Sequence, residues 1–309
     1  MKKKIILSVV SVVVLLFLGI GGYAYYMYDS VKGTAESMHE EVKRDKPKDT
    51  PKITQEKDEP AEPISILMMG VDERQNDQGR SDALIVMTLN PEKEKMQMIS
   101  IPRDTRTEII GHGTTDKINH AYAFGGTKMA IETVENFTNI PIDYYIKVNM
   151  EALSSLVDAM DGVTVHNDLD WYDEGYYKKG YHYREGDIEL NGAKALGYVR
   201  MRHLDPRGDF GRNERQRQVI AAIIGKASNV SSVGKFDDIL DVLGNNVKTD
   251  MTLDDIMSIQ KNYRSAKNTI EQYEIKGQGG KIGGTYYLTV PENEQDKVTE
   301  MLKENLAAS

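Results

Sequence analysis

The feature that most constrains this sequence is an uncharged run of 23 residues near its N-terminus, Ile5 to Met27. A helix rises about 1.5 Å per residue, so the run is about 35 Å long as a helix, enough to cross a bilayer. Lys2, Lys3 and Lys4 precede the run and Asp29 follows it. Because positive residues stay on the cytoplasmic side, the sequence predicts a cytoplasmic tail over 1–4, a transmembrane helix over 5–27 and an extracytoplasmic remainder.

A cleaved signal peptide is the alternative interpretation, since Gly22-Tyr23-Ala24 forms a small-x-small cleavage site. An uncleaved anchor fits better, because the run is longer than a usual signal core and ends in tyrosines typical of a membrane interface. Residues 28–62 follow, rich in both charges and poor in large apolar residues after Met38. Such a segment does not bury enough surface to fold alone, so we expect an extracytoplasmic linker that is coil from residue 36 onward.

Residues 63–309 alternate between strand-like and helix-like patterns. Strands are predicted over 64–70, 84–89, 96–101, 142–148, 163–165, 273–276 and 285–290, with a glycine-rich turn over 277–284. Helices are predicted over 128–137, 150–160, 193–199, 214–226, 237–243, 253–264 and 293–306, with Thr252 capping the sixth. Interleaved elements of this kind predict an α/β fold, an α-β-α layered domain with a mixed central sheet.

Composition and missing motifs exclude several function classes. The net charge of -9 (39 Lys and Arg against 48 Asp and Glu) disfavours nucleic acid as a partner. The absence of cysteine excludes disulfides, thiolate metal sites and a cysteine nucleophile. The sequence also lacks G-x-x-x-x-G-K-[ST], G-x-S-x-G and H-E-x-x-H, which disfavours P-loop NTPases, ordinary α/β-hydrolases and zincins. An S-x-x-K match at Ser232 lacks its companion motifs and carries little weight.

Arginine is distributed unevenly against this acidic background. Ten of the 13 arginines fall in two short stretches, Arg74, Arg80, Arg103 and Arg106, then Arg200, Arg202, Arg207, Arg212, Arg215 and Arg217. The planar guanidinium suits bidentate recognition of phosphate or carboxylate, whereas scattered lysines mainly keep a surface soluble. The sequence therefore predicts a local anion site.

Acids accompany the first arginine stretch at predicted strand ends. Asp72 follows the first strand, Asp82 precedes the second, and Arg103 and Asp104 follow the third. Groups beyond strand ends gather in one crevice of an α/β sheet, where ligands bind. Two carboxylates there suit Mg²⁺, which uses one or two carboxylates together with substrate phosphates. The alternative for any one of these acids is a turn or cap residue.

The second arginine stretch combines two spacings. Arg200 and Arg202 are two apart, which places both on the same face if the segment is extended, and Arg212 and Gln216 share one face of a helix. A helix that begins near Asn213 also offers free amide groups to an anion. Surface arginines paired with nearby acids are the alternative, which explains Arg207, Arg215 and Arg217 well but the whole set poorly. The acids concerned are Asp205, Asp209 and Glu214.

Five separated motifs, in order, resemble the LytR-CpsA-Psr family. They are Met69-Gly70-Val71-Asp72-x-Arg74, Arg80-Ser81-Asp82, Ser100-Ile101-Pro102-Arg103-Asp104-Thr105, Asp116-Lys117-Ile118-Asn119-His120-Ala121-Tyr122, and the stretch from Tyr198 to Gln216. The close resemblance covers about residues 60–225, and the N-terminal anchor matches the family's topology. It identifies residues 63–309 as the family's catalytic domain.

The resemblance implies a cell-membrane enzyme, single-pass type II, whose catalytic domain is extracytoplasmic. Such an enzyme transfers a teichoic-acid-type glycopolymer from polyprenyl pyrophosphate to the N-acetylmuramic acid 6-hydroxyl of peptidoglycan, and polyprenyl phosphate leaves. Asp72 and Asp82 would hold Mg²⁺ (or Mn²⁺) or activate the acceptor hydroxyl. The residues implied as catalytic are Asp72, Asp82, Arg103, Arg200 and Arg202. Those implied to bind pyrophosphate are Arg74, Arg80, Arg103, Lys117, Asn119, Arg200, Arg202, Asp209, Arg212 and Gln216.

Phosphoryl transfer needs mainly positioning and charge neutralisation, so a metal and arginines suffice without a covalent nucleophile. His120 and His203 are expected as hydrogen-bonding support rather than as acid or base. A polyprenyl pyrophosphate hydrolase, a capsule or teichuronic acid ligase, and a metal-free polymer-binding scaffold remain as alternatives. A transcription regulator is disfavoured, because DNA binding requires a basic face in the cytoplasm.

Overall fold

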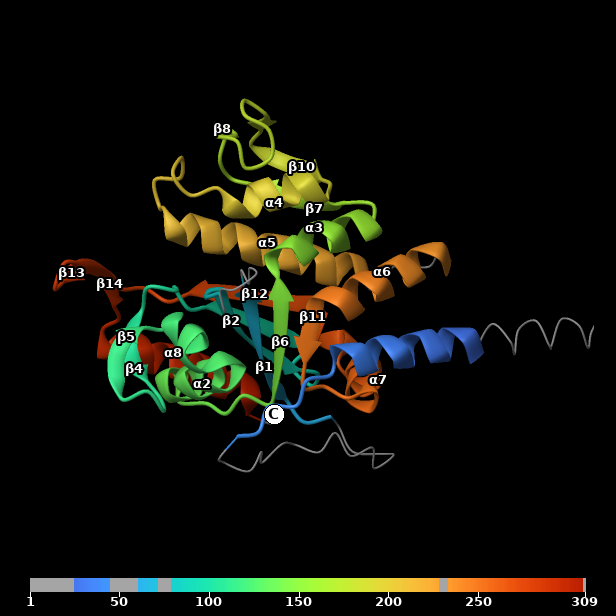
Figure 1. Cartoon of the computed structure of the whole chain (residues 1–309), viewed down its shortest axis with the longest axis horizontal. Coiled ribbons are helices and arrows are strands. Elements are labelled where there is room, and N and C mark those ends of the chain that lie inside the picture. The colour runs from blue at the N-terminus through green and yellow to red at the C-terminus, as the bar shows by residue number, and fades with distance from the viewer. Residues whose placement is uncertain (1–24, 45–60, 72–78, 228–232, 308–309) are drawn as a thin grey trace, which may run out of the picture.

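The computed structural model describes residues 25–44, 61–71, 79–227 and 233–307. Its centre is a six-stranded sheet in the order β11-β6-β1-β2-β3-β12 (Figure 1). These strands are β1 (Ile64–Val71), β2 (Ser81–Asn90), β3 (Lys95–Ser100), β6 (Tyr144–Asn149), β11 (Val247–Thr249) and β12 (Thr269–Glu274). β1 and β6 are parallel, as are β3 and β12, whereas the other neighbours are antiparallel. The predicted mixed sheet is confirmed.

Helices cover both faces of this sheet because successive side chains of each strand point to opposite sides. Leu67 and Met69 of β1 pack in one core with α2 (His120–Thr138) and α8 (Glu292–Leu306). Ile66 and Met68 face the other core, with α5 (Asp209–Ala227) and α7 (Leu253–Asn262). The result is the predicted α-β-α layering.

A third, smaller core lies on the side of α5 that faces away from the central sheet, against Val219, Ala222 and Ile223 (Figure 1). It is built from α3 (Met150–Ala159), β7 (Val163–Asn167), β8 (Trp171–Tyr172), β9 (His182–Tyr183), β10 (Gly186–Leu190) and α4 (Gly192–Arg200). Trp171 stacks on Tyr183 with ring centroids 4.1 Å apart, and Tyr198 of α4 lies beside both rings. This aromatic packing fixes α4, and therefore the loop that joins α4 to α5.

Several short strands were not predicted, namely β8, β9, β10, β11 and the hairpin of β4 (Arg106–Ile109) with β5 (Thr114–Lys117). The glycine-rich segment also differs from the predicted turn. β13 (Gln278–Ile282) pairs with β14 (Thr285–Thr289), and only Gly283 and Gly284 form the turn, with φ of 58° and 85°. Both angles lie in the region that glycine favours, as two-residue hairpin turns require. The predicted Thr252 capping box is present.

The expected linker, coil from residue 36 onward, is coil over only part of its described residues: 36–38 are helical, His39 forms a β-bridge, and 40–44 have no regular secondary structure. A helix covers residues 25–38, here called the N-terminal helix, and it lies beside α6 (Val233–Asn246) (Figure 1). After it, His39 pairs with Thr249 of β11, and Val42 packs against the first core. Within the helix, apolar residues recur at the helical positions Val31, Ala35 and Met38, a pattern that the charged composition of the segment hid.

The predicted cytoplasmic tail, most of the predicted membrane span and residues 45–60 of the linker lie outside the described residues. In the part of the chain that the structure describes, no helix has the length and apolarity needed to cross a membrane.

Candidate active site

One part of the site lies at an edge of the sheet where three strand termini come together. Val71 at the end of β1 pairs with Ser81 at the start of β2, and Ser100 at the end of β3 pairs with Ile85 of β2. This register brings the segments after β1 and β3 together with the start of β2. Accordingly, Arg103 donates from Nη1 to Oδ1 of Asp82 at 2.9 Å.

A second cation reaches the same edge from the β4–β5 hairpin. Nζ of Lys117, the last residue of β5, donates to Oδ1 of Asp104 at 2.6 Å, while Nε of Arg103 lies 3.9 Å from Oδ2 of Asp104. The backbone N–H of Asn119 donates to the carbonyl of Arg103 at 3.3 Å. The buried Oδ1 of Asn119 has no hydrogen-bond partner among the described residues. Asp104 thus joins Arg103 and Lys117, a role that the sequence reading did not assign to it.

The start of α5 supplies the other half of the cluster. Oδ1 of Asp209 lies 3.2 Å from Nε of Arg202 and 3.1 Å from Nη2 of Arg212. Neither contact has hydrogen-bond geometry, and the buried Nε of Arg212 has no hydrogen-bond partner within the described ranges. Gln216 lies one turn further along α5 and is buried. A guanidinium buried with incomplete hydrogen bonding favours an additional anionic ligand.

Two geometric expectations for this region are corrected. α5 begins at Asp209, four residues before the predicted start near Asn213. Arg200 is the last residue of α4 and does not share an extended segment with Arg202. The backbone turns extended only at Met201, so the argument that the two arginines share a face by alternation was wrong.

Electrostatics connects the two halves of the cluster. Burial alone lowers the pKa of Arg103, but Asp82, Asp209 and Asp104 outweigh it and raise that pKa. The pKa of Arg212 is lowered, first by burial and then by the positive charges of Arg103 and Arg202. Arg212 is therefore desolvated beside two like charges, and an anion bound there relieves both penalties. We call Arg103, Lys117, Arg202, Arg212, Asp82, Asp104 and Asp209 the cationic cluster.

The other arginines of α5 and its preceding loop form a separate group. Asp205 is buried and accepts hydrogen bonds from Arg207 and from Nη1 of Arg215, the latter at 2.7 Å. Burial raises the pKa of Asp205, but its two arginines dominate and lower it to about 2. Arg217 donates to Ser100 and lies 3.4 Å from Glu274 of β12. Pairing with Asp205 was expected, whereas Glu274, 57 residues from Arg217, had no local signature.

The remaining predicted residues are distributed as follows. Asp72 and Arg74 lie outside the described residues. Arg80 directly precedes β2 and is exposed, and His203 is exposed in the loop between α4 and α5. His120 lies with Nδ1 2.8 Å from Asp116, whose other oxygen accepts from Tyr287 at 3.1 Å. His120 is thus hydrogen-bonded as expected, while Tyr287 of β14 was missed because it is remote in sequence.

Of the two carboxylates expected to hold a divalent cation, the described residues include only Asp82, whose Oδ1 also accepts from Arg103. No group of three or more His, Cys, Asp or Glu able to hold a metal occurs among the described residues. Asp82 supplies one carboxylate that is 35% exposed. A single carboxylate beside a phosphate site matches Mg²⁺, which takes few protein ligands and completes its shell with phosphate oxygens and water.

An apolar cavity of about 290 Å³ lies on the face of the sheet that α5 and α7 cover. Its walls come from the N-terminal helix, β1, β6, β11, α3, α6 and α7, and loop residue Met251. The lining residues are Met38, Met68, Ile146, Val148, Ala152, Leu156, Val242, Leu243, Val247, Thr249, Met251 and Ile256. Such a dry lining suits a hydrocarbon ligand.

Comparisons with known proteins agree with this arrangement. Residues 25–304 match the LytR_cpsA_psr family. The polyisoprenyl-teichoic acid–peptidoglycan teichoic acid transferase TagU of Bacillus subtilis (strain 168) is 49% identical over 305 residues, covering 99% of this chain and 97% of the relative. The crystal structure of B. subtilis TagU superposes with a TM-score of 0.65 at 48% identity, over 80% of this chain and 98% of that one.

A solved structure of TagT bound to LIIa-WTA is also similar, with a TM-score of 0.72 at 29% identity. It covers 87% of this chain and 100% of that one. The family match covers 280 residues, and the five motifs and the mixed sheet with its edge cluster support it. This chain therefore belongs to the LytR-CpsA-Psr family.

Proposed function

We propose that this chain is a phosphotransferase that attaches a teichoic-acid-type glycopolymer to peptidoglycan. The donor is the glycopolymer on a polyprenyl pyrophosphate carrier, and the acceptor is the 6-hydroxyl of N-acetylmuramic acid. The observation that carries the proposal is the cationic cluster, in which four cations share three carboxylates at one edge of the sheet. The name of the B. subtilis relative, 49% identical over nearly the whole chain, supports the choice of substrate.

In this proposal the pyrophosphate lies against Arg103, Lys117, Arg202 and Arg212. Arg80 and Arg200 complete the positive surroundings, and Asn119 and Gln216 supply neutral hydrogen-bonding groups. Fixed cations stabilise the charge that develops on phosphate oxygens during transfer, and removing one such group typically costs about 10²–10³ in rate. No covalent intermediate with the protein is required.

The reaction is a displacement at the phosphorus nearer to the glycan. The acceptor oxygen forms a new P–O bond, the bond to the bridging oxygen breaks, and polyprenyl phosphate leaves with that oxygen. The hydroxyl proton passes to a carboxylate or to solvent. Asp82, together with Asp72, is proposed to hold Mg²⁺ (or Mn²⁺) or to activate the hydroxyl; a bound Mg²⁺ supplies further neutralisation of phosphate charge.

The apolar cavity is proposed to take part of the polyprenyl tail, and residues 5–27 are proposed to anchor the chain in the membrane that carries the donor. The domain then lies outside that membrane, as the positive residues before the apolar run favour. This topology keeps a lipid-borne donor and the catalytic domain at one surface.

The test is a transfer assay with the full chain, Mg²⁺, a teichoic-acid-type polyprenyl pyrophosphate donor and peptidoglycan. We expect polymer attached to peptidoglycan together with one equivalent of polyprenyl phosphate. Arg212→Ala serves as the site variant and Arg207→Ala as its control, because Arg207 belongs to the separate ion-pair group. Free polymer without adduct would instead support a hydrolase, and a donor preference for capsule or teichuronic acid would reassign the substrate.

A further inference from the structure

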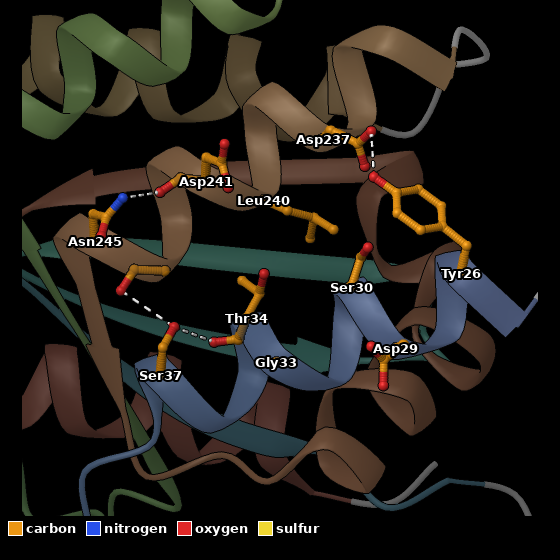
Figure 2. A pocket seen from close by; sticks show the side chains of 11 residues that line it. Tyr26, Asp29, Ser30, Gly33, Thr34, Ser37, Asp237, Leu240, Asp241 and Asn245 are labelled. Atoms are coloured by element: carbon orange, nitrogen blue, oxygen red, sulfur yellow. Dashed lines mark hydrogen bonds between the residues drawn. The ribbon is translucent and has the colours of Figure 1, made fainter.

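The N-terminal helix is fastened along α6 by hydrogen bonds at both ends (Figure 2). Near its start, Tyr26 donates from its hydroxyl to Asp237 at 3.0 Å. Near its end, Ser37 donates from Oγ to the carbonyl of Gly244 at 3.3 Å, and Lys248 donates to the carbonyl of Ser37 at 2.6 Å. The helix is therefore an integral part of the folded domain.

The helix borders two different cavities. A polar cavity of about 390 Å³ lies between the helix and α6 along the helix from Tyr26 to Ser37, and Asp29, Asp237 and Asp241 line it (Figure 2). The last residue of the helix, Met38, lines the apolar cavity together with Val242 of α6. The helix is thus held to α6 through polar groups, and its last residue closes an apolar space.

The two helices approach each other closely at Gly244. A Cβ atom added to Gly244 would lie 2.8 Å from Oγ of Ser37, a hydroxyl that can rotate away, and 3.6 Å from Cγ2 of Thr34. Gly33, on the N-terminal helix, has nothing within 4 Å of an added Cβ. A side chain larger than a methyl group at 244 therefore meets Ser37, the residue before Met38, whereas the same side chain at 33 meets open space.

We propose that the N-terminal helix forms one wall of the site for the polyprenyl tail, with Met38 as a residue that contacts the tail and Gly244 as a positioning residue. The proposal rests on the proposed function, in which the apolar cavity takes that tail. Met38 lies 11 residues after the end of the apolar run, about 16 Å along a helix. The segment that leaves the membrane thereby also completes the tail site above it.

Four variants of the full chain separate this role from general packing. Met38→Asp places a carboxylate in the cavity wall, and Met38→Leu keeps the wall apolar. Gly244→Leu forces the helices apart, although leucine is a good helix former and leaves α6 itself intact. Gly33→Leu makes the same exchange at the open position and is the matched control.

The measurement compares affinity for a long-chain polyprenyl phosphate with affinity for geranyl phosphate, in the same detergent micelles. The ratio of the two reports binding of the tail. We expect Met38→Asp and Gly244→Leu to lower that ratio about tenfold or more, because a buried carboxylate or a displaced wall removes apolar contact. Met38→Leu and Gly33→Leu should keep the wild-type ratio. In turnover, the KM for the lipid donor should rise while kcat changes little.

Equal ratios in all four variants would overturn the proposal, and so would a wild-type chain that does not prefer the long tail. Transfer activity measured in the same preparations decides the proposed function separately. Transfer that persists with an unchanged ratio rejects only the role of the N-terminal helix. Absent transfer in a wild-type chain that binds the long tail rejects the proposed function and leaves the tail site standing.

Discussion

Two groups of arginines lie a few residues apart on α5 and its preceding loop, and their surroundings differ. Arg207, Arg215 and Arg217 face three acids, Asp205, Glu214 and Glu274. The cationic cluster has four cations for three acids, Asp82, Asp104 and Asp209. The first group has as many acids as arginines, whereas the second has one more cation than acids and so retains net positive charge that a ligand can neutralise.

The comparison teaches that sequence proximity to an acid does not distinguish a structural arginine from a binding one. Arg212 and Arg215 are three residues apart, and each lies within reach of an aspartate. Asp205, which Arg215 shares with Arg207, has a side chain that is 1% exposed. Asp209, which Arg212 shares with Arg202, is 21% exposed. The partner's surroundings, rather than its presence, determine which role the arginine has.

The largest expected effect falls on the balanced group. Replacing Arg215 by Met leaves the buried Asp205 without its short ion pair, since Nη1 of Arg215 lies 2.7 Å from that carboxylate. Removing one partner of a buried pair typically destabilises a protein by about 3–5 kcal/mol. Urea unfolding of the variant should show this loss. A loss below about 1 kcal/mol would place Arg215 with the exposed surface arginines.

The next effect falls on activity. Arg103→Ala or Arg212→Ala should lower kcat/KM for transfer by about 10²–10³, equivalent to about 2.7–4 kcal/mol. The melting temperature should change little, because each guanidinium in the cluster lies beside like charge as well as beside carboxylates. Steady-state rates and thermal melts on the same samples check both parts. A variant that unfolds but retains full rate when folded would reverse the assignment.

A pH effect is expected from Glu274, which lies beside Arg217 in the first group. Burial dominates the surroundings of Glu274 and raises its pKa from 4.5 to about 7, even though Arg217 and Asn213 favour the charged form. Between these values the folded chain holds a proton that the unfolded chain has released. Stability from this group is therefore present at low pH and lost as pH rises from about 4.5 to 7. Glu274→Gln should flatten that slope in urea unfolding; an unchanged slope would assign the titration elsewhere.

The smallest effect is expected at Arg207. Its side chain is 50% exposed although it contacts Asp205 and Glu214. Exposed pairs typically contribute about 0–1 kcal/mol, so Arg207→Ala should lower unfolding free energy by no more than about 1 kcal/mol. Transfer activity should stay at the wild-type level. A loss as large as that of Arg212→Ala would join the two groups into one site.

Much of the fold followed from periodicity, and the failures have physical causes. Most of the central strands and the long helices from α2 onward were predicted because their apolar spacing is regular, as in β1 and α7. The three-residue β11 was missed, and the strand predicted over 273–276 overlaps only the end of β12. The β4–β5 hairpin was missed because its strands are short and mostly exposed, so no buried face left a pattern. The N-terminal helix was missed because its first residues fall in the predicted membrane span and the rest carries only a narrow apolar stripe, Val31, Ala35 and Met38, among charged residues.

The residues of the candidate site that were predicted from the sequence are those that lie within local motifs. The motifs after β3 and at the start of α5 identified Arg103, Asp209 and Arg212, which the fold brings together. Tyr287 and Glu274 join through β14 and β12, far along the chain, and nothing near them in sequence marks that contact. Pairing between distant strands is set by the whole sheet rather than by adjacent residues.

The most direct test of the central claim is calorimetric titration of inorganic pyrophosphate into the wild-type chain, Arg212→Ala and Arg207→Ala. The excess positive charge of the cationic cluster predicts binding to wild type and to Arg207→Ala with equal affinity, weakened by added salt. Arg212→Ala should bind at least about tenfold more weakly, as expected for loss of a charge-assisted contact. Equal affinity in all three proteins, or equal loss in both variants, would contradict the assignment of the anion site to this cluster.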